Sequence, residues 1–169
     1  MQERGGGLTT ALAHNALAAL SARYGTDDLD LTDLRMDSRR GDLTVRVRDS
    51  AHPGQLDELT FSDGHLSKPS PVMVRASDDL DAQTFPVHRV TALGRVEQVF
   101  DTALAGTRYP GAVVQTIEVT RGTAVKPLSS KGRKGRPVPV NVVVSVTSPR
   151  AQAQVVFDAD GRAEKVIRQ

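Results

Sequence analysis

The sequence predicts an α+β fold of two tandem repeats, in each of which one helix packs on an antiparallel β-meander. Two observations support this prediction. Segments with helical periodicity and segments with strand alternation follow one another in the same order in both halves of the chain, and similar turn residues mark corresponding points. The pattern leaves open whether the two sheets are separate or form one continuous curved sheet.

The composition is that of a globular protein: the chain has 169 residues, of which 38% are hydrophobic and 25% charged. Cysteine is absent, which excludes disulfides, thiolate metal sites and cysteine nucleophiles. Aromatic residues make up 4% of the chain, which disfavours a platform for stacking nucleic-acid bases. No apolar run reaches the roughly 18 residues that a membrane-spanning helix needs.

The first predicted unit covers residues 8–75 and follows a flexible tether at 1–7, which contains three consecutive glycines. Apolar residues at spacings of three and four predict a helix over 8–24, with Gly25 as its stop. The apolar side chains of 29–36 change face midway, which indicates a β-bulge or a short helical turn. Alternation predicts strands over 43–48 and 58–62, a hairpin at Asp63-Gly64, and a proline-containing edge strand over 66–74.

The second predicted unit covers residues 89–169, after a polar linker at 76–88. An apolar stripe predicts a helix over 90–108. We interpret a loop at 122–137 as an insertion between the first and second predicted strands of this unit. Alternating apolar residues predict those strands and two more, over 113–119, 140–147, 153–157 and 163–167.

Corresponding landmarks support the repeat. Arg23-Tyr24-Gly25 ends the first helix, and Arg108-Tyr109-Pro110 ends the second helix 85 residues later. Phe61 and Phe157, which precede the two hairpin turns, are 96 residues apart. The second half is therefore longer by 11 residues, and the loop at 122–137 accounts for them. The alternative is that two unrelated segments share common turn residues by chance.

This tandem order, closing on Val155-Val156-Phe157-Asp158-Ala159-Asp160-Gly161-Arg162, resembles PepSY-type domains and the tandem-repeat β-lactamase inhibitor proteins. It is also similar to the extracytoplasmic domains of actinobacterial lipoproteins and membrane-anchored kinases. The resemblance implies a non-catalytic role in the cell envelope, in which the domain binds a protein or another ligand. The three glycines of the tether separately favour a membrane anchor upstream of residue 1, and the alternative is a natural cytoplasmic N-terminus. The resemblance assigns no functional residue, and the lack of cysteine separates this chain from the disulfide-bonded inhibitors.

The sequence contains no recognisable catalytic, metal or cofactor motif. Its four histidines lack the spacing of metal ligands, and no Gly-x-Ser-x-Gly motif is present. Asp158 and Asp160 resemble part of a calcium loop, but the loop's remaining ligands are missing, so a hairpin turn is the simpler interpretation. We therefore expect no catalytic residues, no metal and no cofactor, and a protein that is not an enzyme. The four histidines, all expected to be solvated, are His14, His52, His65 and His88.

Two surfaces are candidates for binding. The first is the open face of the sheet, which no predicted helix covers. The second is the basic loop, since no acidic residue occurs between Glu118 and Asp158. The candidate residues of the open face are Arg46, Arg48, Thr60, Asn141, Ser145 and Thr147. Those of the basic loop are Lys126, Lys131, Arg133, Lys134 and Arg136.

The predicted function is that of a non-enzymatic extracytoplasmic binding or sensor domain, part of a lipoprotein or another membrane-tethered protein. It would recognise a protein or an envelope ligand on the open sheet face, while the basic loop contacts an anionic membrane, an envelope polymer or an acidic partner. The loop could equally be a solvated hairpin without a partner. The alternative function is a cytoplasmic nucleic-acid-associated protein that binds phosphates through residues 126–136. The oligomeric state is left open.

Overall fold

The computed structural model describes residues 8–121 and 139–169. The predicted tether at 1–7 and the whole of the predicted basic loop at 122–137 lie outside these ranges. The helices are α1 (Thr10–Tyr24), α2 (Leu80–Gln83) and α3 (Val96–Thr107), with short 3₁₀ turns η1 (Val87–Arg89) and η2 (Thr91–Gly94). The strands are β1 (Asp30–Asp37), β2 (Asp42–Arg48), β3 (Leu56–Ser62), β4 (His65–Leu66), β5 (Ser70–Val72), β6 (Phe85–Pro86), β7 (Val113–Arg121), β8 (Val140–Thr147), β9 (Gln152–Asp158) and β10 (Ala163–Arg168).

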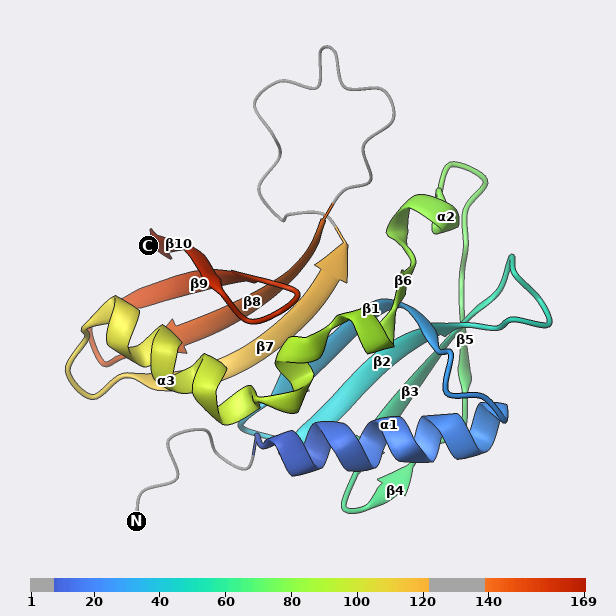
Figure 1. Ribbon diagram of the computed structural model, residues 1–169, viewed down its shortest axis with the longest axis horizontal. Helices are drawn as coiled ribbons and strands as arrows, with labels where there is room; N and C mark the ends of the chain where they lie inside the picture. The colour runs from blue at the N-terminus through green and yellow to red at the C-terminus, as the bar shows by residue number, and fades with distance from the viewer. Residues whose placement is uncertain (1–7, 122–138) are drawn as a thin grey trace.

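The predicted fold of two helix-on-meander repeats is wrong, because the structure is dominated by one large antiparallel sheet (Figure 1). Strands account for 41% of the structure and helices for 26%. The strand order is β10-β9-β8-β7-β1-β2-β3-β4, with β5 beside β3 and β6 beside β1. Leu34 of β1 lies opposite Val45 of β2 on one side and Val119 of β7 on the other. Backbone hydrogen bonds between β1 and β7 therefore join the two halves at the middle of the sheet.

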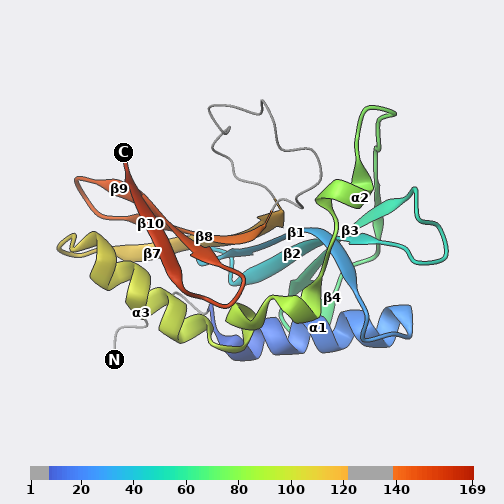
Figure 2. The ribbon, with the colours of Figure 1, turned by 45° about the horizontal axis from the view of Figure 1, so that its top comes forward.

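Helices α1 and α3 lie on the same face of the sheet (Figure 2). The predicted first helix is confirmed: Thr9 caps its N-terminus by accepting the Leu12 N–H, and Gly25 ends it in the left-handed conformation. Helix α3 begins later than predicted, at Val96, because residues 91–94 form η2 instead. It buries Val99, Phe100 and Ala103 against the strands of the second half.

The core lies between these two helices and the inward side chains of the strands. Leu20 of α1 and Leu34, Val144 and Phe157 of the sheet are all fully buried. Burying each such side chain contributes about 1.5–3 kcal/mol, so this single layer is the main source of stability.

A bulge in β1 explains the change of face that the sequence shows over 29–36. The register shifts between Leu31 and Asp33, so Leu31 and Leu34 both point into the core. This confirms the bulge and excludes the helical turn that was its alternative. It also places Asp33 and Arg35 on the face away from α1 and α3, where they become part of the candidate site.

Two connecting segments differ from prediction. The supposed linker at 76–88 carries α2, β6 and part of η1, and Phe85 pairs with Leu31 of β1 and is fully buried. It is therefore packed into the fold, which its polar composition had concealed. The predicted edge strand over 66–74 is split into β4 and β5. Pro69 lies between the two strands and cannot donate to a ladder of hydrogen bonds, whereas Pro71 is accommodated within β5.

Candidate functional site on the open sheet face

Helices α1 and α3 cover one face of the sheet and leave the other face open (Figure 2). Over the central strands, this open face carries polar side chains. In one row across the sheet, Glu118 of β7, Arg35 of β1 and Thr44 of β2 lie side by side. In the next row, Thr116 of β7 lies beside Asp37 of β1. This face is polar because alternate residues of each strand are turned away from the helices.

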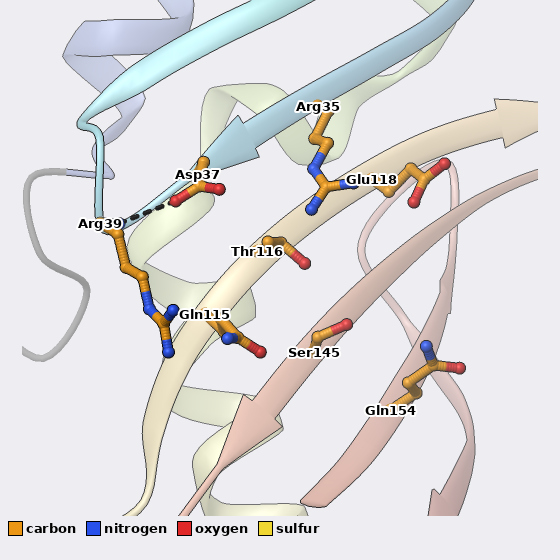
Figure 3. Close-up of a pocket in the computed structure, with 8 residues that line it drawn as sticks. All are labelled: Arg35, Asp37, Arg39, Gln115, Thr116, Glu118, Ser145 and Gln154. Atoms are coloured by element: carbon orange, nitrogen blue, oxygen red, sulfur yellow. Dashed lines mark hydrogen bonds between the residues drawn. The ribbon is translucent and has the colours of Figure 1, made fainter.

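The open face is hollowed into two adjoining depressions of about 400 Å³ each, which share Arg35 and Asp37. Both are polar. The first, over β1, β7, β8 and β9, is lined by Arg35, Asp37, Arg39, Gln115, Thr116, Glu118, Ser145 and Gln154 (Figure 3). The second, over β1, β2 and β3, is lined by Asp33, Arg35, Asp37, Arg40, Asp42, Thr44, Arg46 and Glu58.

The turn after β1 holds Arg39 in place beside the first depression. Asp37 Oδ1 accepts the backbone N–H of Arg39 at 2.9 Å and that of Arg40 at 3.4 Å. The Ser38 N–H donates to the Gln115 carbonyl at 3.0 Å, which ties the turn to the neighbouring strand. The backbone that carries Arg39 is therefore fixed on both sides.

The guanidinium groups of Arg35 and Arg39 both lie over β7. Arg35 reaches over this strand from β1, and Arg39 reaches it from the turn (Figure 3). Within residues 8–121 and 139–169, neither side chain makes a hydrogen bond or an ion pair. Glu118 lies beside Arg35, but its carboxylate points away from that guanidinium. Arg46, by contrast, donates from Nε to Glu58 at 3.0 Å in the second depression.

Asp33 is a half-buried carboxylate that lines the second depression. Its burial raises its pKa from 3.8 to about 6, and the neighbouring charge of Glu118 adds to the effect, against the opposing influence of Arg46 and Arg35. Its Oδ1 atom is inaccessible and has no hydrogen-bond partner. The pKa of Asp33 therefore lies well above that of an ordinary aspartate, at about 6.

Three of the predicted open-face residues are engaged by other protein groups. Arg46 pairs with Glu58, as described above. Arg48 donates to Asp81 of α2 at 2.7 Å and to the Pro53 carbonyl at 2.6 Å, so it anchors α2. The Thr60 hydroxyl lies 3.2 Å from that of Thr44.

The other three predicted residues lie on β8 and differ in access. Ser145 lines the first depression. Asn141 is only 3% exposed, and Thr147 lies at the end of the strand opposite Gln152. A binding role for these six positions stays a prediction, and the structure places only Ser145 beside the two arginines.

Sequence reasoning missed the charged centre of the face, namely Asp33, Arg35, Asp37 and Glu118. The reason is that the position of the bulge in β1 decides which of its side chains face away from the helices, and the sequence alone did not give that position. The signal was present, since Asp33, Arg35 and Asp37 alternate with Leu34 and Met36. Glu118 likewise stands between Ile117 and Val119.

The basic-loop residues Lys126, Lys131, Arg133, Lys134 and Arg136 lie outside the described residues, so their role stays a prediction. Asp158, the first residue of the calcium-like fragment, forms a hairpin turn: its Oδ1 accepts the backbone N–H of Asp160 at 2.9 Å and that of Arg162 at 3.0 Å. Across the described ranges, no cluster of three His, Asp or Glu side chains is arranged to hold a metal.

None of the helices in the described part of the chain is long and apolar enough to cross a membrane.

Comparisons with known proteins add information on the fold alone. No family model matches the sequence, so the resemblance to PepSY-type domains stays a prediction. No curated protein matches it either. Among solved structures, the crystal structure of a "putative lipoprotein" from Clostridium difficile 630 superposes with a TM-score of 0.59 over 91% of this chain and 90% of that one, at 11% identity. The two chains therefore share a fold over nearly their whole length.

Proposed function

We propose that the protein is a non-enzymatic extracytoplasmic binding domain that recognises its ligand on the open sheet face. The observation that carries this proposal is a pair of guanidinium groups, Arg35 and Arg39, which lie over a polar depression on that face and form no hydrogen bond or ion pair with any residue that the structure describes. Charged groups without protein partners are available to a ligand, and loops and surfaces held by a rigid sheet are common binding sites.

The extracytoplasmic location rests on the structural comparison. The solved structure from Clostridium difficile, which shares this fold, is described as a lipoprotein, a class of protein attached to a membrane. We therefore place this domain outside the cytoplasm, tethered to a membrane.

A binding role fits the chemistry of the face better than catalysis does. The residues that line the two depressions are carboxylates, guanidinium groups, hydroxyls and amides, and no histidine or lysine is among them. Asp33 has the raised pKa of a general acid, but it lines only the second depression, whereas Arg39 lines only the first.

Site-specific photocrosslinking in living cells tests the binding surface. A photoreactive residue is placed at Gln154 in the first depression, or at Gln98 on the exposed side of α3 as the matched control. We expect a light-dependent adduct from position 154 and none from position 98. Equal adducts from both positions, or no adduct from 154, would contradict binding on the open face.

Protease treatment tests the location separately, with the natural full-length protein in spheroplasts of its own cells. We expect added protease to digest it while a cytoplasmic marker survives. Protection until the cells are lysed would contradict the extracytoplasmic assignment.

A further inference from the structure

We infer that the first depression is an oxyanion site, in which Arg35 and Arg39 bind the phosphate group of a small polar ligand. The inference rests on the proposed function, because it uses the same open face, and it adds the chemical class of the ligand. It is argued from the charge, the donors and the rigidity of the residues around the depression.

The two arginines supply the charge. Each guanidinium has five N–H donors, and hydrogen bonds from such a group to a phosphate are about twice as strong as neutral ones. Arg35 and Arg39 extend over the same strand, β7, from two successive parts of the chain (Figure 3). A ligand above Thr116 would therefore lie between two cationic groups that no described protein group neutralises through a hydrogen bond.

Neutral donors on β7, β8 and β9 complete the site. Thr116 and Ser145 offer hydroxyl groups from opposite positions of neighbouring strands, and Gln154 offers an amide from the next strand, opposite Ser145. A carboxylate has two oxygens, whereas a phosphate has three or four and accepts hydrogen bonds from more donors. The number and spread of donors therefore favour a phosphate, and the polar lining disfavours an apolar ligand.

The negative charges of Asp37 and Glu118 lower the affinity of the depression for phosphate, but neither carboxylate occupies the two guanidinium groups. Asp37 Oδ1 is occupied by the N–H groups of Arg39 and Arg40 in the turn. Glu118 directs its carboxylate away from Arg35 (Figure 3), and its charge acts on Asp33. We expect weak binding of free phosphate that weakens further with salt, because the site is shallow and open to solvent.

Preorganisation supports the site. Arg35 lies at the centre of the sheet, where β1 pairs with both β2 and β7. Arg39 lies in a turn that is held by Asp37 and by the Ser38–Gln115 hydrogen bond. The backbone therefore needs no rearrangement on binding, and only the two side chains lose freedom.

The test is an NMR titration of the arginine Nε–H signals of the folded protein, with sodium phosphate as the probe at pH 7.5. Sodium acetate is the second probe, and sodium chloride keeps the ionic strength constant. We expect saturable shifts of the Arg35 and Arg39 signals with phosphate. The double variant Arg35→Gln/Arg39→Gln should raise the Kd for phosphate at least tenfold. The charge-matched control Arg75→Gln/Arg89→Gln, which changes two exposed arginines elsewhere, should leave it unchanged.

Each other outcome would overturn the inference. Acetate binding as tightly as phosphate would show a general anion site and reject phosphate as the ligand class. Shifts that do not saturate, or a Kd that both double variants raise equally, would show screening by net charge. If phosphate fails while the photocrosslink from position 154 persists, this inference falls and the proposed function stands. If phosphate binds and the crosslink is absent, the proposed function is the one contradicted.

Discussion

Glu97 of α3 accepts two hydrogen bonds from Thr10 of α1, although the two residues are 87 positions apart in the chain. The Thr10 backbone N–H donates to Oε1 at 2.9 Å, and its hydroxyl donates to Oε2. The Val96 N–H in turn donates to the Thr10 hydroxyl oxygen at 3.0 Å. Each helix thus satisfies free N–H groups at the start of the other, where a negative charge is also favourable.

We expect Glu97→Ala to lower the free energy of unfolding by about 1–2 kcal/mol at pH 7, because it removes both acceptors of this link. Urea denaturation followed by circular dichroism measures the change. Gln98→Ala, at the next and exposed position of α3, is the control and should have little effect. Equal stability of the two variants would contradict a stabilising role for the link.

The same contact predicts a dependence on acid. The hydrogen bonds from Thr10 hold the pKa of Glu97 below its usual 4.5, so the folded state favours the ionised carboxylate. This stabilisation is complete above pH 4.5 and is lost as the pH falls through the lowered pKa. The difference between wild type and Glu97→Ala should therefore shrink in acid, and a difference that stays constant down to pH 3 would exclude the ionised form as its source.

Alanine substitutions at Gly161 and Gly64 distinguish the cost of backbone strain from the cost of a packing clash. Both have positive φ angles, 85° and 78°, so alanine at either position costs roughly 1 kcal/mol in the left-handed region. A Cβ at Gly161 would also lie 3.2 Å from Val99 Cγ2 and 3.4 Å from Ala92 Cβ, whereas one at Gly64 would meet nothing within 4 Å. We expect Gly161→Ala to lower the melting temperature more than Gly64→Ala does. Equal losses would show that the β9–β10 hairpin does not pack closely against α3.

Asp33→Asn should stabilise the protein at alkaline pH. Burial and Glu118 raise the pKa of Asp33 to about 6, while Arg46 and Arg35 oppose them and Glu58 contributes less. The folded state therefore favours the protonated acid, and wild type loses stability as the pH rises from about 4 to above 6. Asparagine cannot ionise and avoids this loss. Because the site is partly open to solvent, we expect a gain on the order of 1 kcal/mol at pH 8.

Denaturant titrations at pH 8 and pH 4 check this prediction. The gain from Asp33→Asn should be largest at pH 8 and should nearly disappear at pH 4. Asp30→Asn, which changes an exposed carboxylate at the start of the same strand, is the control. A gain that is the same at both pH values would mean that the variant acts through packing and not through charge.

Local patterns in the sequence predicted most of the secondary structure. Helix α1 and strand β8 were predicted directly from their periodicity. The change of face of the apolar side chains within 29–36 indicated the bulge in β1. The segment 76–88 was misjudged because Phe85 stands alone among polar residues, and a two-residue strand has no detectable period. Its burial depends on the pairing of Phe85 with Leu31, more than 50 residues earlier.

The sequence predicted an uncovered face of the sheet but not which residues of several strands line one depression on it, for a related reason. Alternation identifies which side chains of a strand share a face, and Ser145, which it assigns to the open face, lines the first depression. It does not identify which strands are neighbours. Arg35 and Ser145 line one depression because β1 and β8 both pair with β7, on opposite sides of that strand.

The local amino-acid sequence thus determined where most of the helices, strands and turns of this protein form, because propensity and hydrophobic period act over a few neighbouring residues. Folding in three dimensions decided that β1 and β7 pair at the centre of one sheet, and hence that Arg35 and Arg39 meet the polar groups of β7, β8 and β9. Any strand edge offers the same N–H and C=O groups, so the choice of partner depends on how all the inward side chains pack together with α1 and α3.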